Sequence, residues 1–181
     1  AVNIIAHRGA SHDAPENTLA SVRLGWKQNA DMVEVDIYLS KDNRIVVIHD
    51  KDLKRTTGTV GLVKEKTLAQ LQTLDAGSWK SPKWEGEPIP ALSQILPTIP
   101  KGKKLVIEIK CGPEIVGPLS RLLKSTKTRA DQTAIISFSY EVVIAAKKEF
   151  PDRAVYFLKT LEQNASTGKW PQVDPLIDLA T

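Results

Sequence analysis

DMVEVDIYLSKDNRIVVIHD, residues 31–50, is the stretch that decides the fold prediction for this chain. Apolar and polar side chains alternate in its first part, which predicts a strand with Glu34 and Asp36 on the same face. A polar turn at residues 41–44 leads into a short apolar run that ends at His49, as a buried strand would. The stretch therefore predicts a hairpin-like join that brings two carboxylates and an imidazole together.

The same stretch also fits a simpler interpretation. A strand face that carries Glu, Asp and Tyr is in most proteins the solvated side of an antiparallel hairpin, and Lys-Asp-Asn-Arg at residues 41–44 suits its turn. Taken alone, the stretch favours this solvated hairpin, so the rest of the chain must decide between the two interpretations.

Composition fits one domain with its own core and narrows the function classes. The chain has 181 residues, of which 41% are hydrophobic and 25% charged. Its net charge of +4 suits an anionic substrate, but the basic residues are interleaved with acidic ones, which argues against nucleic-acid binding. No apolar run approaches the roughly 20 residues of a membrane-spanning helix, so we expect no stable membrane insertion.

Two further features of the sequence bear on its compartment. The single cysteine, Cys111, rules out an internal disulfide framework and leaves the redox compartment open. The chain begins Ala-Val-Asn without an initiator methionine, which slightly favours an exported protein, periplasmic or extracellular. The sequence leaves the compartment and the oligomeric state undecided.

Strand and helix patterns alternate along the rest of the chain. This alternation predicts right-handed crossovers and a parallel sheet with one irregular join, which is an α/β fold. Residues 51–100 are too long for a plain loop and are predicted to form an insertion with two short helices, at residues 67–74 and 90–96. The other expected strands are residues 2–6, 104–110, 133–139 and 154–158, and the other expected helices are residues 19–27, 114–124 and 141–149, with a further one opening at residues 176–179.

Polar residues with catalytic chemistry lie on the predicted strands or directly after them. His7 and Arg8 follow the first strand, His49 ends the hairpin, and Glu108 and Lys110 lie on a later strand. This is the pattern of an active site on the carboxyl face of an α/β barrel. In such a barrel the inner strand faces that carry Glu34 and Asp36 and those that carry Glu108 and Lys110 would point toward one another.

The residue types point to phosphodiester cleavage. Glu34, Asp36 and Glu108 are three carboxylates, which favour a hard divalent cation, Mg²⁺ or Ca²⁺, over zinc. Two histidines on different strands can act as general acid and general base. Arginine and lysine supply the positive charge that a phosphate group needs.

Five motifs in this order resemble the sequence pattern of the glycerophosphodiester phosphodiesterases. They are HRG at residues 7–9, PENT at 15–18, EVD at 34–36, HD at 49–50 and EIK at 108–110. The resemblance implies a (β/α)8 barrel of the triosephosphate isomerase (TIM) type with a small insertion after the second strand. It also implies a phosphoric diester hydrolase of lipid and glycerol metabolism that converts a small-molecule glycerophosphodiester to an alcohol and glycerol 3-phosphate, with a bound divalent ion.

The resemblance also implies roles for individual residues. The catalytic pair is His7 and His49, the phosphate-binding residues are Arg8 and Lys110, the metal ligands are Glu34, Asp36 and Glu108, and the residues that shape the site are Glu16 and Asn17. Asn17 and Thr18 are both candidates for capping the first helix. His12 matches no required position, so we expect it to be exposed.

The chain departs from the family pattern at its carboxyl end. Only five principal parallel strands are found, so we expect residues 1–181 to form a single barrel domain from which the last barrel strands are absent. Two alternatives to a glycerophosphodiesterase remain open. One is a related lipid phosphodiesterase of the phospholipase D type, and the other is a catalytically inactive barrel that binds a metal ion and phosphate.

Overall fold

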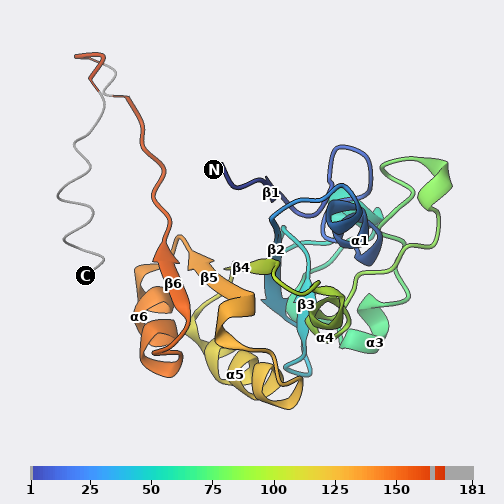
Figure 1. The fold of residues 1–181 in the computed structure, drawn as a ribbon. Helices are drawn as coiled ribbons and strands as arrows, with labels where there is room; N and C mark the ends of the chain where they lie inside the picture. The colour runs from blue at the N-terminus through green and yellow to red at the C-terminus, as the bar shows by residue number, and fades with distance from the viewer. Residues whose placement is uncertain (1, 164–165, 170–181) are drawn as a thin grey trace.

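The computed structural model describes residues 2–163 and 166–169, which form one twisted sheet with helices packed around it (Figure 1). Parallel strands follow the order β1-β2-β4-β5-β6, and β3 pairs with β2 in the antiparallel direction. The strands are β1 Ile5–Ala6, β2 Met32–Leu39, β3 Ile45–Val47, β4 Lys104–Ile109, β5 Thr133–Ser137 and β6 Ala154–Phe157. The expected parallel sheet and its antiparallel join are thus confirmed, whereas the helix expected to open at residues 176–179 lies outside the described residues.

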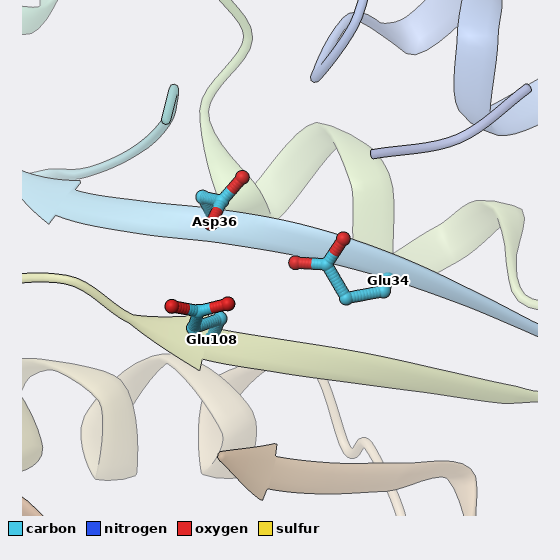
Figure 2. A group of neighbouring side chains, drawn as sticks. All are labelled: Glu34, Asp36 and Glu108. Carbon is cyan, nitrogen blue, oxygen red and sulfur yellow. The ribbon is translucent and has the colours of Figure 1, made fainter. Parts of the chain in front are cut away.

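The register of β2 against β4 fixes which side chains meet at the site. Asp36 lies directly opposite Glu108, and Glu34 lies opposite Val106 (Figure 2). Because side chains alternate between the two faces of a strand, these three acidic residues point to the same side of the sheet.

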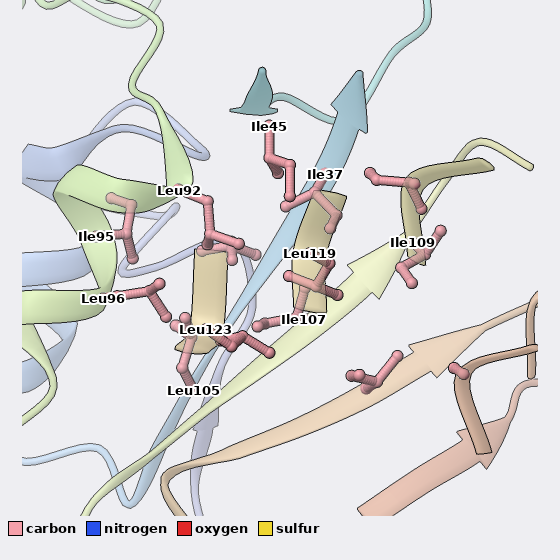
Figure 3. Close-up of a cluster of buried hydrophobic side chains, with 14 of the residues drawn as sticks. Ile37, Ile45, Leu92, Ile95, Leu96, Leu105, Ile107, Ile109, Leu119 and Leu123 are labelled. Carbon is pink, nitrogen blue, oxygen red and sulfur yellow. The ribbon is translucent and has the colours of Figure 1, made fainter. Parts of the chain in front are cut away.

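The apolar residues of the same two strands point to the other side and form the main core (Figure 3). Ile37, Leu105 and Ile107 are fully buried there, against Leu119 of α5 (Val116–Ser125) and Leu92 of α4 (Leu92–Ile95). A slip of one residue would turn Glu34 and Asp36 into this core and the apolar residues out of it. Since each buried aliphatic side chain contributes about 1.5–3 kcal/mol, the core holds the acidic face in register.

The helices lie close to the predicted ranges, and those inside residues 51–100 are short. The α-helices are α1 Leu19–Lys27, α2 Lys54–Thr57, α3 Leu68–Leu71, α4 Leu92–Ile95, α5 Val116–Ser125 and α6 Tyr140–Glu149, and the 3-10 helices are η1 Val63–Glu65, η2 Pro82–Trp84, η3 Leu96–Thr98, η4 Pro113–Ile115 and η5 Ala130–Gln132. Thr18 caps α1, because its hydroxyl accepts a hydrogen bond from the Ser21 N–H at 3.2 Å. No helix in the described part of the chain is long and apolar enough to cross a membrane.

Residues 51–100 have a small core of their own. Leu53, Leu71 and Ile89 pack there with Val46 and Ile48, which lie in β3 and just after it. The segment leaves the sheet after β3 and returns beside the same strand, where the Val47 N–H donates to the Pro90 carbonyl at 2.9 Å. The chain therefore comes back to β3 at Pro90, just before α4.

Candidate active site

Three carboxylates from two neighbouring strands converge on one side of the sheet (Figure 2). Glu34 and Asp36 come from β2 and Glu108 from β4, and each offers an oxygen within 4.8 Å of the others. Their residues are only 4%, 0% and 8% exposed. The solvated-hairpin interpretation is therefore wrong: this polar face lies inside the protein, because β4 packs alongside β2 and the loops after β1 and β3 cover it.

Burial of like charges raises the pKa of two carboxylates in this cluster and leaves two of its oxygens without a hydrogen-bond partner in the described part of the chain. Burial raises the pKa of Glu34 to about 8, and repulsion from Asp36 adds to the effect. Burial also raises the pKa of Asp36. Among the described residues, Glu34 Oε1 and Asp36 Oδ1 have no hydrogen-bond partner. Two buried carboxylate oxygens without partners, in an all-oxygen cluster, fit a hard divalent cation.

The PENT motif orients Asp36 through Asn17. Asn17 has a positive φ of 58°, and its amide group donates to Asp36 Oδ2 at 2.8 Å and accepts from the Asp36 N–H at 3.0 Å. Asparagine tolerates this left-handed conformation better than most residues. Of the two candidates for the helix cap, Thr18 is the cap, and Asn17 instead holds one of the three carboxylates.

Arg8 lies at the turn after β1, with a φ of 55°. Its backbone N–H donates to Glu34 Oε2 at 2.8 Å, its Nη1 donates to Glu16 at 3.0 Å, and its Nε lies 3.5 Å from Asp36 Oδ2. The next residue, Gly9, also has a positive φ, and a Cβ there would collide with Ser21. Glycine thus lets the chain turn closely over α1 and places the guanidinium beside the carboxylates.

Lys110 brings a second cation to the site from the end of β4. Its Nζ donates to Glu108 Oε1 at 2.8 Å and lies 3.7 Å from Asp36 Oδ1. The same Nζ lies 3.4 Å from His49 Nε2. Arg8 and Lys110 therefore approach the carboxylates from two sides.

The two predicted catalytic histidines lie beside the carboxylate cluster. His7 Nε2 is 3.9 Å from Glu34 Oε2, and its side chain is 67% exposed. His49 is 27% exposed, and its Nδ1 lies 2.6 Å from Asp50 Oδ1. His12 lies outside the site, paired with Asp13 and almost fully exposed, as expected.

Arg55 of α2 is the residue of this region that the sequence did not reveal. Its Nη1 and Nη2 donate to Glu16 at 2.9 and 2.7 Å, and its Nε donates to Asp50 at 2.5 Å. Its guanidinium also lies 6.0 Å from the centre of the Trp79 ring. Arg55 and Glu16 are 39 residues apart, so no local pattern could have connected them.

An α/β sheet with acidic, basic and imidazole groups at its carboxyl end defines a barrel-type site for phosphate chemistry. Comparison with known proteins agrees, because the glycerophosphoryl diester phosphodiesterase family matches residues 7–174. The chain belongs to this family. A solved phosphodiesterase from Oleispira antarctica, in complex with the product sn-glycerol-3-phosphate, is 35% identical with a TM-score of 0.85, over 98% of this chain and 72% of that one.

Other relatives agree on the family and on the fold. A glycerophosphodiester phosphodiesterase of Bacillus subtilis is 33% identical over 90% of this chain and 61% of its own length. One from Caldanaerobacter subterraneus is 39% identical over 82% of this chain and 63% of its own length. A solved Agrobacterium tumefaciens enzyme has a TM-score of 0.78 at 32% identity, over 86% of this chain and 66% of that one. This chain thus spans about three fifths of the length of the two curated relatives.

The predicted fold class is confirmed by these solved relatives, which are barrels of the TIM type. In this chain the described residues contribute five parallel strands, β1, β2, β4, β5 and β6, to an open sheet. The carboxylate cluster lies at β2 and β4, which are inner strands of this sheet, so its geometry does not depend on the two edges.

Proposed function

We propose that this protein hydrolyses glycerophosphodiesters to an alcohol and glycerol 3-phosphate with the help of a divalent ion. The observation that carries the proposal is the buried, partly unsatisfied carboxylate cluster with a histidine on each side and two cations facing it. The relative with bound sn-glycerol-3-phosphate supports the choice of substrate class. Residues 51–100 would form an insertion within a single domain.

Glu34, Asp36 and Glu108 would hold the ion. Their hard oxygen donors suit Mg²⁺ or Ca²⁺. A bound divalent ion supplies positive charge that neutralises the phosphate in the transition state. Because the pKa of Glu34 is raised to about 8, ion binding at neutral pH must release a proton from the cluster, so affinity should increase with pH.

Arg8 and Lys110 would bind the phosphate oxygens. Each is already held by one carboxylate, Arg8 by Glu16 and Lys110 by Glu108. Their side chains are only 20% exposed, so little side-chain entropy is lost when a phosphate binds.

His7 and His49 would transfer the protons. The nucleophile, a substrate hydroxyl or a water molecule, must lose a proton as it attacks phosphorus, and the departing alkoxide must gain one. The contact of His49 Nδ1 with Asp50 leaves Nε2 to face the site. His7 lies beside Glu34 and His49 beside Lys110, so the two imidazoles would serve different oxygens of one phosphate.

The test compares His7→Ala and His49→Ala on two diesters. A p-nitrophenyl leaving group departs without protonation, so loss of the general acid should reduce kcat/KM much less with it than with a glycerophosphocholine-like substrate. Loss of the base should reduce kcat/KM by a similar factor with both, within about 10²–10⁴-fold. His12→Ala, an exposed histidine away from the site, is the matched control and should keep wild-type activity.

Two outcomes would contradict the proposal. Near-normal activity of either site variant on the glycerophosphocholine-like diester would remove that histidine from the mechanism. Absence of turnover in the wild type, with ion binding intact, would favour the inactive metal- and phosphate-binding barrel.

A lipid diester is the second candidate substrate. A pocket of about 310 Å³ lies beside the site, and its lining combines apolar side chains such as Leu62 and Val63 with the charged Lys51, Lys64 and Glu114. Turnover of lysophosphatidylcholine at a rate above that of glycerophosphocholine would favour this candidate.

A further inference from the structure

We propose that Arg55 is a positioning residue that fixes the proton-transfer geometry of His49 and, through a second carboxylate, the direction of Arg8. The catalytic consequence rests on the proposed function. The structural consequence, which is the state of the His49 ring, does not.

Arg55 joins two loops that have no other charged link with each other among the described residues. One guanidinium edge binds Glu16, in the loop after β1, and Nε binds Asp50, directly after His49. The result is a continuous series of paired groups, Arg8–Glu16–Arg55–Asp50–His49, which we call the charge series. Its first four members alternate in charge, and it ends at the His49 imidazole. Alternation lets each group stabilise both neighbours.

The short helix that carries Arg55 is anchored by buried neighbours. Its neighbours Leu53 and Thr56 are 0% and 6% exposed, so α2 is anchored on both sides of the arginine. The Trp79 ring also lies near the guanidinium, at 6.0 Å. Arg55 therefore extends from a fixed turn of residues 51–100 toward the site.

Asp50 determines which nitrogen of His49 carries the hydrogen. Its Oδ1 accepts from Nδ1, and on the other edge of the ring the Lys110 ammonium donates toward Nε2 at 3.4 Å. Both contacts require the tautomer with hydrogen on Nδ1 and a free lone pair on Nε2. Arg55 occupies the second oxygen of Asp50, so it holds the carboxylate plane that selects this tautomer.

Glu16 carries the effect to Arg8. It is the shared acceptor of Arg8 and Arg55, and its side chain is 11% exposed. Arg8 Nε now lies 3.5 Å from the Asp36 carboxylate. Without Arg55, Glu16 would pair with Arg8 only, and this stronger pairing would pull the Arg8 guanidinium away from Asp36. The Arg55 guanidinium thus fixes both the tautomer of His49 and the direction of the Arg8 side chain.

The shape of the guanidinium is as important as its charge. Arg55 uses three N–H groups in a planar fork to reach two carboxylates, whereas a lysine at this position is a point charge that reaches one at a time. Arg55→Lys should therefore fail to restore what Arg55→Gln loses.

The experiment measures the His49 tautomer directly. The chain has three histidines, so ¹⁵N-histidine labelling and long-range ¹H–¹⁵N spectra at pH 8.5, in the ion-free protein, resolve each ring, with His7→Gln and His12→Gln for assignment. We expect the wild type to show His49 with hydrogen on Nδ1, and Arg55→Gln and Arg55→Lys to show a mixture of tautomers. Arg129→Gln is the matched control, because Arg129 forms an exposed pair with Asp131 just before β5 begins, at the amino end of the sheet.

Kinetics on the ion-loaded protein provide the second measurement. We expect kcat to fall about 10–100-fold in both Arg55 variants, KM to rise only a few-fold, and Arg129→Gln to match the wild type. An unchanged His49 tautomer in a folded Arg55→Gln or Arg55→Lys protein would overturn the proposal. An inactive wild type with a shifted tautomer in the variants would overturn the proposed function and leave the positioning role of Arg55 standing.

Discussion

The carboxylate cluster and the charge series lie side by side, and they are built in opposite ways. Glu34, Asp36 and Glu108 are like charges, and two of their oxygens have no hydrogen-bond partner among the described residues. In the charge series both carboxylates, Glu16 and Asp50, accept on each of their oxygens. Burial of unpaired charge is unfavourable, whereas alternating charges satisfy one another. The difference fits the proposed function, in which a ligand from outside completes the first region, whereas the carboxylates of the second are already paired.

The largest expected effect is a loss of activity when the carboxylate cluster is changed. Glu34→Gln combined with Asp36→Asn removes two of the three anionic groups, and a divalent ion is worth several kcal/mol in such a reaction. We expect kcat/KM to fall about 10³-fold or more and the remaining activity to be insensitive to chelator. The measurement is glycerol 3-phosphate release from glycerophosphocholine, with and without EDTA. Chelator-sensitive activity in the double variant would place the ion elsewhere.

The next effect is on the stability of the ion-free protein. The folded-state pKa of Glu34 is raised to about 8, so its protonated form stabilises the fold at low pH, and this stability is lost as pH rises from about 4.5 to 8. Glu34→Gln lacks the ionisable group, so at pH 8 it should be more stable than the wild type by about 4 kcal/mol. Urea unfolding at pH 5 and pH 8 in EDTA measures this. A variant that is less stable than the wild type at pH 8 would show that the cluster is not destabilised by its own charge.

A divalent ion should reverse that instability. At a hundredfold excess over its dissociation constant, an ion that binds only the folded state stabilises it by about 2.7 kcal/mol. We expect the melting temperature of the wild type to rise with Mg²⁺ or Ca²⁺, and the rise to vanish in the double variant. An unchanged melting curve at saturating ion would count against the cluster as the ion site.

The smallest effect is a loss of stability in Glu16→Gln, opposite in sign to the gain expected for Glu34→Gln. Burial opposes ionisation of Glu16, but the hydrogen bonds and positive charges of Arg55 and Arg8 together outweigh it and hold the pKa of Glu16 below its usual range. Its ionised form therefore stabilises the fold above the unfolded-state pKa, and this stability is lost as pH falls through the lower, folded-state pKa. Glu16→Gln should reduce the stability of the ion-free protein by about 1 kcal/mol at pH 8. Stabilisation instead would mean that the charge series is as strained as the carboxylate cluster.

The sequence predicted the first region better than the second, for a physical reason. Glu34 and Asp36 alternate with buried residues in one strand, and Glu108 repeats the pattern, so local periodicity placed all three on one face. The motifs then supplied the family and its barrel. The contact of Arg55 with Glu16 spans 39 residues and depends on how α2 packs, which no local pattern records. For the same reason the sequence could not decide between Asn17 and Thr18 as the cap of α1.

The small core of residues 51–100 has a consequence for how the family could diversify. Residues 51–90 leave β3 and return beside it, and their buried apolar residues pack with one another and with β3. The α4 helix that follows belongs to the main core. Changes in the middle of such a segment alter neither the length nor the register of the strands that carry the carboxylates. Selection could thus vary this segment in one gene region while the strands that carry the three carboxylates stay unchanged. Under the proposed function, exchange of this segment between relatives, with Arg55 kept, is a way to vary the surroundings of the site without moving the carboxylates.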